Sequence, residues 1–212
     1  MIKAVIFDFD GVIVETERQR FDFLKKQLER HGHELKAEHF SQLRGISTKS
    51  FLKKVFGNKL SENFIEQIKD ERYKDYHSRP GLHITKVPGL ESLLKSLQEK
   101  GIAMAIASAS RSSEIKRVLE FLDLSRYFRQ ITGAEETEKH KPEPDLYLIA
   151  LRKLKLKPEQ CIVIEDSAVG VEAAKAAGMK VIAITTTHER QELKKADRII
   201  SAYQELKDLS FL

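Results

Sequence analysis

The stretch KAVIFDFDGVIVET, residues 3–16, decides the fold prediction because a hydrophobic run in it leads into two carboxylates. Apart from Asp8, residues 4–9 are apolar and mostly β-branched or aromatic, which is typical of a buried strand. Asp10 follows two residues after Asp8, and Gly11 comes next. Buried carboxylates repel each other, and each is costly to desolvate unless a cation compensates for it. The stretch therefore predicts a strand that brings two acidic groups to a site holding positive charge.

The composition is that of a globular chain long enough for a core domain with a small insert. Its 212 residues are 41% hydrophobic, and the aromatic residues are spread along the chain. No segment reaches the ~18 apolar residues of a membrane span, and the N-terminus lacks a signal-peptide pattern. The one cysteine, Cys161, lies in an apolar run and is expected to be buried. We expect a cytoplasmic protein without a membrane partner.

The charge pattern argues against a nucleic-acid partner. The formal net charge is +5, from 37 basic and 32 acidic residues. The two signs interleave, as in EKHKPEPD, and the sequence has no basic stripe with aromatic residues between the charges. The mild positive excess suits a small anionic substrate. We expect no nucleic-acid binding, and a monomer or a weak homo-oligomer.

Strand and helix signals alternate along the chain from residue 81 onward. Apolar residues recur at helical spacing in four segments, at 90–97, 115–122, 145–156 and 168–178. Apolar runs predict buried strands at 102–107, 161–165 and 181–185. We also expect short strands at 129–132 and 198–200. Such alternation predicts a parallel sheet wrapped by helices, which is a Rossmann-like α/β core.

Residues 16–80 break this alternation, because their apolar residues recur only at helical spacing. Proline–glycine pairs at 80–81 and 88–89 are turn signals that mark the return to the alternating pattern. We therefore expect two domains. Residues 1–15 and 81–212 would form the α/β core, and residues 16–80 an inserted all-helical domain.

Polar side chains follow the predicted strands at the edge where ligands bind in an open parallel sheet. They comprise Asp8 and Asp10 after the first strand, Ser108 and Ser110 after the second with Ala109 between them, Glu165 and Asp166 after the fourth, and Lys141 before the helix at 145–156. We expect the compensating cation to be a bound metal, assisted by Lys141. Hard oxygen ligands without histidine or cysteine nearby favour Mg²⁺.

Each of these residues also has a purely structural interpretation. Asp8 and Asp10 are common turn or capping residues, and Ser108 can cap the helix that follows it. Lys141 can be a solvated lysine in a charged segment, and Glu165 can lie outside direct contact with a metal. The ordered combination, rather than any single residue, favours the functional interpretation.

Four motifs occur in the order and at the separations of a known family. They are DFDGV at 8–12, Ser108 after a hydrophobic strand, KPEPD at 141–145 and IEDS at 164–167. Because of these four motifs, the sequence resembles the haloacid dehalogenase-like phosphohydrolases, and the resemblance covers essentially the whole chain. The helical insert resembles the cap domain of the β-phosphoglucomutase-like subgroup. The motifs SAS at 108–110 and VPG at 87–89 also resemble that subgroup.

The resemblance implies a phosphoaspartyl mechanism. Asp8 would be the nucleophile, and Asp10 the general acid that later activates the hydrolytic water. Mg²⁺ would be bound by Asp8, by the backbone carbonyl of Asp10 and by Asp166. Glu165 would bind it directly or through a water molecule.

The resemblance also implies which groups hold the phosphate. Ser108 would donate to a phosphoryl oxygen, and Lys141 would pair with both the phosphoryl group and the nucleophile. Gly11 would let backbone N–H groups approach the phosphate. Ala109 and Ser110 are further substrate-binding candidates in the loop after the second strand.

Residues of the helical cap are expected to select the substrate. Arg20, Arg44 and Lys49 are the candidates for substrate contacts, and each has the alternative of an exposed helical cation. Thr48 stands where the mutases of the subgroup have an arginine that holds the distal phosphate. This departure disfavours a mutase.

We therefore expect a Mg²⁺-dependent phosphatase that hydrolyses a small phosphorylated metabolite, in particular a sugar phosphate. One alternative is a β-phosphoglucomutase-type sugar-phosphate mutase. The other, of a different class, is a catalytically idle phosphate-binding module on the same fold.

Overall fold

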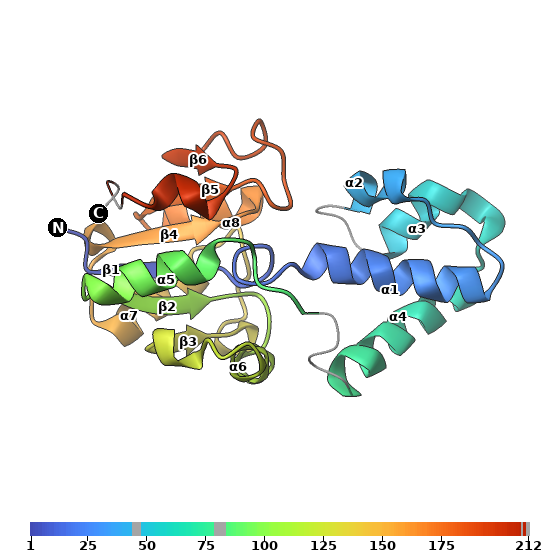
Figure 1. Cartoon of the computed structure of the whole chain (residues 1–212), viewed down its shortest axis with the longest axis horizontal. Helices are drawn as coiled ribbons and strands as arrows, with labels where there is room; N and C mark the ends of the chain where they lie inside the picture. Colours follow the sequence, from blue (N-terminus) through green and yellow to red (C-terminus); the bar gives the residue numbers. More distant parts are fainter. Residues whose placement is uncertain (44–47, 79–83, 209, 211–212) are drawn as a thin grey trace. The chain divides into compact units, whose positions relative to one another are not determined.

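The chain forms two compact units, which Figure 1 shows in ribbon form. The computed structural model describes residues 1–43, 48–78, 84–208 and 210. Met1–Glu15 and Thr85–Leu212 make one unit, and Thr16–Ile84 makes the other. We call the first the α/β unit and the second the helical unit.

A six-stranded parallel sheet forms the centre of the α/β unit, with the strand order β3-β2-β1-β4-β5-β6. The strands β1 to β6 are Ala4–Phe7, Ala103–Ala107, Gln130–Thr132, Cys161–Glu165, Lys180–Ile184 and Arg198–Ile200. The five strands predicted from residue 102 onward are present within one residue of their expected bounds, whereas β1 ends at Phe7, two residues before the end of the run at 4–9. Every pairing in the sheet is parallel. The Rossmann-like α/β prediction is therefore confirmed.

The register of the central strands places the residues that follow them side by side. Phe7, the last residue of β1, pairs with Ile164 of β4, so Asp8 comes next to Glu165. The Asp8 N–H donates to the Ile164 carbonyl at 2.9 Å, which extends the ladder by one residue. Ser108 follows β2 on the other side of β1. The sheet alone thus brings three of the predicted site residues to one edge.

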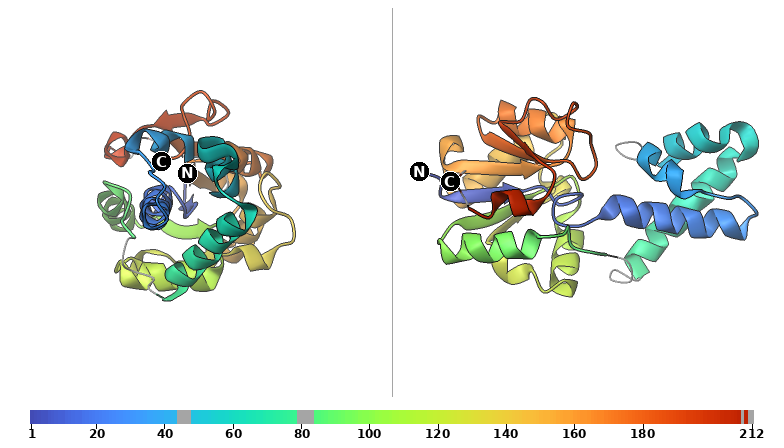
Figure 2. Two further views of the ribbon diagram at one scale, coloured as in Figure 1. Left: turned by 90° about the vertical axis from the view of Figure 1, so that its right-hand side faces the viewer. Right: turned by 45° about the horizontal axis from the view of Figure 1, so that its top comes forward.

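Helices cover both faces of the sheet. They are α5 (Leu90–Glu99), α6 (Ser112–Phe121), α7 (Asp145–Leu154) and α8 (Ala168–Ala176). The apolar side chains of α7 and α8 join alternate strand residues, among them Ala4, Ile6 and Val163, in one buried cluster. Figures 1 and 2 show α5 on the opposite face. Ser167 caps α8 by accepting a hydrogen bond from the Gly170 N–H at 3.1 Å.

The helical unit has its own hydrophobic core. Its elements are α1 (Thr16–Arg30), η1 (Ala37–His39), α2 (Phe40–Leu43), α3 (Thr48–Phe56), η2 (Gly57–Lys59) and α4 (Glu62–Ser78). The helical periodicity of the sequence supplies this core, in which Phe21, Leu24, Leu28, Phe51 and Ile65 are buried. Neither these helices nor any other described helix is long and apolar enough to cross a membrane.

Candidate active site

Lys141 and Asp8 form a buried ion pair at the carboxyl edge of the sheet. Asp8 directly follows β1, and Lys141 lies in the loop before α7. The Lys141 Nζ atom is 2.6 Å from Asp8 Oδ1 and 2.6 Å from Glu165 Oε1. The side chains of the lysine and of both acids are each at least nine-tenths buried. Lys141 is therefore a cation that compensates the acidic groups at the end of the first strand.

Glu165, the last residue of β4, is held by hydrogen bonds on both carboxylate oxygens. Its Oε1 atom accepts from Lys141 Nζ and from the Tyr147 hydroxyl, the latter at 2.9 Å. Its Oε2 atom accepts from the Asp166 N–H at 2.8 Å, and from the Ser167 N–H and hydroxyl at 2.9 Å each. The Ser167 donors belong to the N-terminus of α8, where a negative charge is favoured. Glu165 is consequently a fully hydrogen-bonded buried anion.

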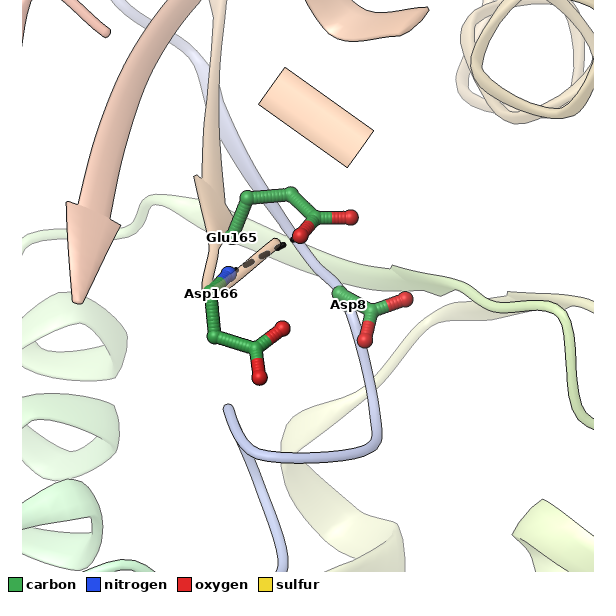
Figure 3. A group of neighbouring side chains, drawn as sticks. All are labelled: Asp8, Glu165 and Asp166. Atoms are coloured by element: carbon green, nitrogen blue, oxygen red, sulfur yellow. Dashed lines mark hydrogen bonds between the residues drawn. The ribbon is translucent and has the colours of Figure 1, made fainter. Parts of the chain in front are cut away.

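Asp166 completes a group of three buried carboxylates. Figure 3 shows Asp8, Glu165 and Asp166 at the ends of β1 and β4. One carboxylate oxygen from each of the three lies within 4.8 Å of the others. Asp166 Oδ2 also accepts a hydrogen bond from the buried Thr187 hydroxyl, which orients the carboxylate. Three acidic side chains therefore surround one small volume.

The pKa values show that one lysine does not balance three acids. Burial raises the pKa of Asp8 to about 7, and the charges of Glu165 and Asp10 add to this effect. Lys141 opposes the rise without cancelling it. Burial, followed by the charges of Glu165 and Asp8, raises the pKa of Asp166 well above its usual value. Burial works in the same direction on Glu165, but Lys141 and the hydrogen bonds outweigh it, so the pKa of Glu165 is lowered.

This donor set fits a divalent metal ion. It consists of oxygen atoms only, which are the ligands that hard cations such as Mg²⁺ prefer. Burial, and after it the charges of neighbouring carboxylates, raises the pKa values of Asp8 and Asp166, and a bound cation would favour the charged forms of both groups. The group is thus a candidate metal site among the described residues.

The loops after β1 and β2 are connected through Asp10. The Ser110 hydroxyl donates to Asp10 Oδ2 at 2.7 Å, and the Ser110 N–H donates to Ser108 Oγ at 3.1 Å. Ser108 is buried, whereas Ala109 beside it is exposed. Asp10 is half-buried, so its carboxyl group is held but accessible. The structure therefore brings the predicted serines to the second carboxylate as well.

Gly11 makes room for Asp166. Its φ angle is +76°, and a Cβ atom there would lie 1.9 Å from Asp166 Oδ2. The Gly11 N–H donates to the Val14 carbonyl at 2.8 Å, and the Gly11 carbonyl accepts from the Thr186 hydroxyl at 2.5 Å. Only glycine satisfies both the left-handed backbone and the close approach of the carboxylate.

The two described candidates from the helical unit have partners within that unit. Arg20 Nη2 donates to the Leu43 carbonyl at 2.6 Å, at the end of α2. Lys49 Nζ lies 2.7 Å from a Glu62 carboxylate oxygen and 3.9 Å from one of Glu66, in an exposed charge network between α3 and α4. Arg44 lies outside the described residues.

Sequence reasoning missed Tyr147 and Thr187. Thr187 follows β5 by three residues, so the rule that places ligand groups after the strands could have found it. Tyr147 gave no such signal, because a tyrosine on the apolar face of a helix usually belongs to the core. Along α7 the buried residues are Leu146, Tyr147, Ala150 and Leu151, and Ile149 and Leu154 are partly buried.

Comparisons with known proteins agree with this geometry. The sequence model of the family described as haloacid dehalogenase-like hydrolase matches residues 5–184. The phosphorylated carbohydrates phosphatase of Thermotoga maritima is 31% identical over 85% of this chain and 84% of its own length. The β-phosphoglucomutase of Bacillus subtilis is 29% identical over 97% of this chain and 92% of its own length. The crystal structure of a β-phosphoglucomutase from Clostridium difficile superposes with a TM-score of 0.72 at 30% identity, covering 100% of this chain and 96% of that one.

Proposed function

Because this chain belongs to the haloacid dehalogenase-like hydrolases, we propose that it is a phosphatase of small phosphorylated metabolites that uses a phosphoaspartyl intermediate. The observation that carries the proposal is the buried Lys141–Asp8 pair beside two further carboxylates. A site of this kind offers a nucleophile, a cation for a phosphoryl group and ligands for a metal. The names of the matched relatives, among them a phosphorylated carbohydrates phosphatase, support phosphate-ester chemistry.

Asp8 and Asp10 would carry the two covalent steps. A carboxylate oxygen of Asp8 attacks phosphorus while the bond from phosphorus to the leaving oxygen breaks, and Asp10 protonates that oxygen. The products of this step are the free alcohol and an acyl phosphate on Asp8. Asp10 then takes a proton from water, the water oxygen attacks phosphorus, and the bond to Asp8 breaks to release inorganic phosphate.

Lys141 and Ser108 would bind the transferring group. The Lys141 ammonium uses two hydrogen-bond directions on Asp8 and Glu165, and an ammonium has a third donor for a phosphoryl oxygen. Ser108 Oγ accepts from the Ser110 N–H, so its own hydroxyl hydrogen can be donated. Charge on the phosphoryl oxygens would thus be stabilised by preorganised donors.

Asp8, Asp166 and the backbone carbonyl of Asp10 would hold Mg²⁺. When bound, the ion would reduce the repulsion between the anionic nucleophile and the anionic phosphate. The Glu165 oxygens already accept five hydrogen bonds from protein donors, so we place Glu165 behind the direct ligands.

The substrate class we propose is the sugar phosphates. The Thermotoga maritima relative is named for phosphorylated carbohydrates, and two other matches are named β-phosphoglucomutase. The same matches make a sugar-phosphate mutase the second candidate. Thr48, a buried residue at the start of α3, weakens that candidate because the subgroup's mutases have an arginine there.

Phosphate release tests the proposal. Wild-type protein is incubated with Mg²⁺ and a panel of sugar phosphates, beside Asp8→Asn and a chelator control. Asp123→Asn is the matched control because Asp123 is exposed, far along the chain from the site motifs. We expect release that both Asp8→Asn and the chelator abolish and that Asp123→Asn retains. Conversion of β-glucose 1-phosphate to glucose 6-phosphate without phosphate release would establish the mutase instead, and neither activity on a broad panel would overturn both.

A further inference from the structure

Tyr147 places a polar group in an otherwise apolar cluster under the sheet. The residue is fully buried on α7, among side chains such as Leu146 and Ala150. Its hydroxyl donates to Glu165 Oε1 at 2.9 Å. The Lys141 Nζ atom lies 5.0 Å from the centroid of the Tyr147 ring. One side chain therefore contacts both the buried anion and the buried cation of the site.

We propose that Tyr147 is a positioning residue, which fixes Lys141 by holding the Glu165 oxygen to which that lysine is bonded. Lys141 and the Tyr147 hydroxyl share Glu165 Oε1 as their acceptor. Without the tyrosine donor, that oxygen would keep Lys141 as its hydrogen-bond donor and would lose the donor that does not depend on the lysine. The role rests on the proposed function, because it concerns the lysine that would bind the transferring phosphoryl group.

The surroundings of Glu165 leave the carboxylate little freedom apart from this contact. The Oε2 atom is fixed by three donors from Asp166 and Ser167. Gly170 of α8 lies directly against the other oxygen, since a Cβ atom at Gly170 would be 1.7 Å from Oε1. Tyr147 thus supplies the remaining constraint on Oε1.

The chemistry of Lys141 explains why this constraint matters. An ammonium group has three donors, and two of them are directed at Asp8 and Glu165. The direction of the third donor is then determined by the positions of those two acceptors. Burial raises the pKa of the Tyr147 hydroxyl well above its usual value, so it acts as a donor throughout the working pH range. The ring face adds an attraction for the buried ammonium.

The alternative interpretation is that Tyr147 is a core residue whose hydroxyl only needs a hydrogen-bond partner and has no effect on Lys141. Tyr147→Phe separates the two, because it keeps the ring, the packing and the cation–π contact and removes only the hydroxyl. Tyr127→Phe is the matched control. Tyr127 is also buried, but its hydroxyl accepts from Arg126 Nη2 rather than contacting the site.

The test is steady-state hydrolysis of p-nitrophenyl phosphate with Mg²⁺ by wild type, Tyr147→Phe and Tyr127→Phe, with thermal unfolding of each. We expect Tyr147→Phe to lower kcat by about tenfold with KM within twofold of wild type, because the residue acts through another and does not touch substrate. Tyr127→Phe should retain kcat. Inactive wild-type protein would refute the proposed function, whereas active wild type with unchanged kcat in Tyr147→Phe would overturn only the role of Tyr147.

A second variant displaces the carboxylate that carries this oxygen. Gly170→Ala would place a methyl group 1.7 Å from Glu165 Oε1, 2.0 Å from its Cδ and 2.4 Å from its Oε2, so the carboxylate must shift while Tyr147 is unchanged. We expect a loss of kcat at least as large as that of Tyr147→Phe, with helix α8 itself not weakened by alanine. If folded Gly170→Ala retained the wild-type kcat, the position of Glu165 Oε1 would not matter for turnover, and the proposal would be overturned. The proposal would also be overturned if the loss of kcat in Tyr147→Phe were accounted for by the fraction of unfolded protein.

Discussion

The Lys141 Nζ atom lies 2.6 Å from Asp8 Oδ1, although 133 residues separate the two in the sequence. The parallel sheet makes this contact possible, because β1 and β4 end at one edge and the loop before α7 reaches the same place. Each member of the pair is buried, so removing Lys141 leaves the buried charges of Asp8 and Glu165 without their cation. Stability and chemistry are therefore coupled at this contact.

Lys141→Met should reduce both activity and stability. Loss of a charge that binds a transferring phosphoryl group typically costs about 10²–10³-fold in kcat. Unpaired Asp8 and Glu165 should also lower the free energy of unfolding, by roughly 3–5 kcal/mol. Denaturant unfolding at pH 8 measures this loss. Lys175→Met is the control, because Lys175 pairs with Asp197 at an exposed site and should cost about 1 kcal/mol or less. Equal losses in the two variants would contradict a special role for burial at Lys141.

Asp8 should make the stability of the metal-free protein fall as the pH rises. Its pKa is raised from 3.8 to about 7, so the native state holds this proton more tightly than the unfolded chain does. The resulting contribution to stability is complete below about pH 3.8 and is lost as the pH rises through about 7. Asp8→Asn cannot lose a proton. Its melting temperature should therefore exceed that of wild type by roughly 3–6 °C at pH 8 and by less at pH 5. A difference that stays constant between these pH values would show that Asp8 titrates normally.

Gly11→Ala should disturb Asp166. The substitution adds a Cβ atom 1.9 Å from Asp166 Oδ2 and imposes a left-handed backbone on alanine. Gly32→Ala separates these effects, since Gly32 has a φ angle of +77° and no atom within 4 Å of the added Cβ. We expect both variants to lose about 1–2 kcal/mol of stability from backbone strain. Only Gly11→Ala should also lose Mg²⁺-dependent phosphate release, by about 100-fold. Comparable activity in the two variants would mean that Asp166 does not need this space.

Ser110→Ala should impair the chemistry of Asp10 selectively. The variant removes the donor that holds Asp10 Oδ2 at 2.7 Å. A general acid matters most when the leaving oxygen is strongly basic, so hydrolysis of sugar phosphates should slow by about tenfold and that of p-nitrophenyl phosphate by much less. Initial rates on both substrates measure the contrast. Ser96→Ala, which removes a hydroxyl bonded only to a carbonyl of its own helix, is the control and should leave both rates unchanged. A uniform loss on both substrates would instead indicate general damage to the loop.

The sequence predicted the elements and the edge at which the site lies, because both depend on local patterns. The apolar run of β1 and the leucines of α5 have the periodicity of buried elements, and the sheet order then places Asp8 beside Glu165. The partners of long side chains were not predictable in the same way. Arg20 and Lys49 were candidates for substrate contacts or exposed helical cations, and in the structure each is bonded to a group brought near by the packing of the helical unit. Such contacts depend on tertiary distances that a single sequence does not contain.

Tyr147 shows a further limit. The packing makes it part of the apolar core, since the ring is fully buried. The hydroxyl meets a functional group because Glu165 stands at the end of β4. The same residue thus satisfies two demands, and neither was predicted from the sequence.

Mg²⁺ should stabilise the protein through Asp166. The pKa of Asp166 is raised by burial and by neighbouring carboxylates, so a bound cation relieves an unfavourable charge in the native state. Binding to the native state alone adds stability that grows with the logarithm of the ion concentration, about 2.7 kcal/mol at 100 times the dissociation constant. Asp166→Asn should remove this dependence, whereas Asp123→Asn should keep it. Thermal unfolding over a range of Mg²⁺ concentrations, with a chelator as the zero point, measures both. If Asp166→Asn retained the full Mg²⁺ dependence, the ion would be binding elsewhere. Lys141 would then be the cation that compensates the charges of the three carboxylates.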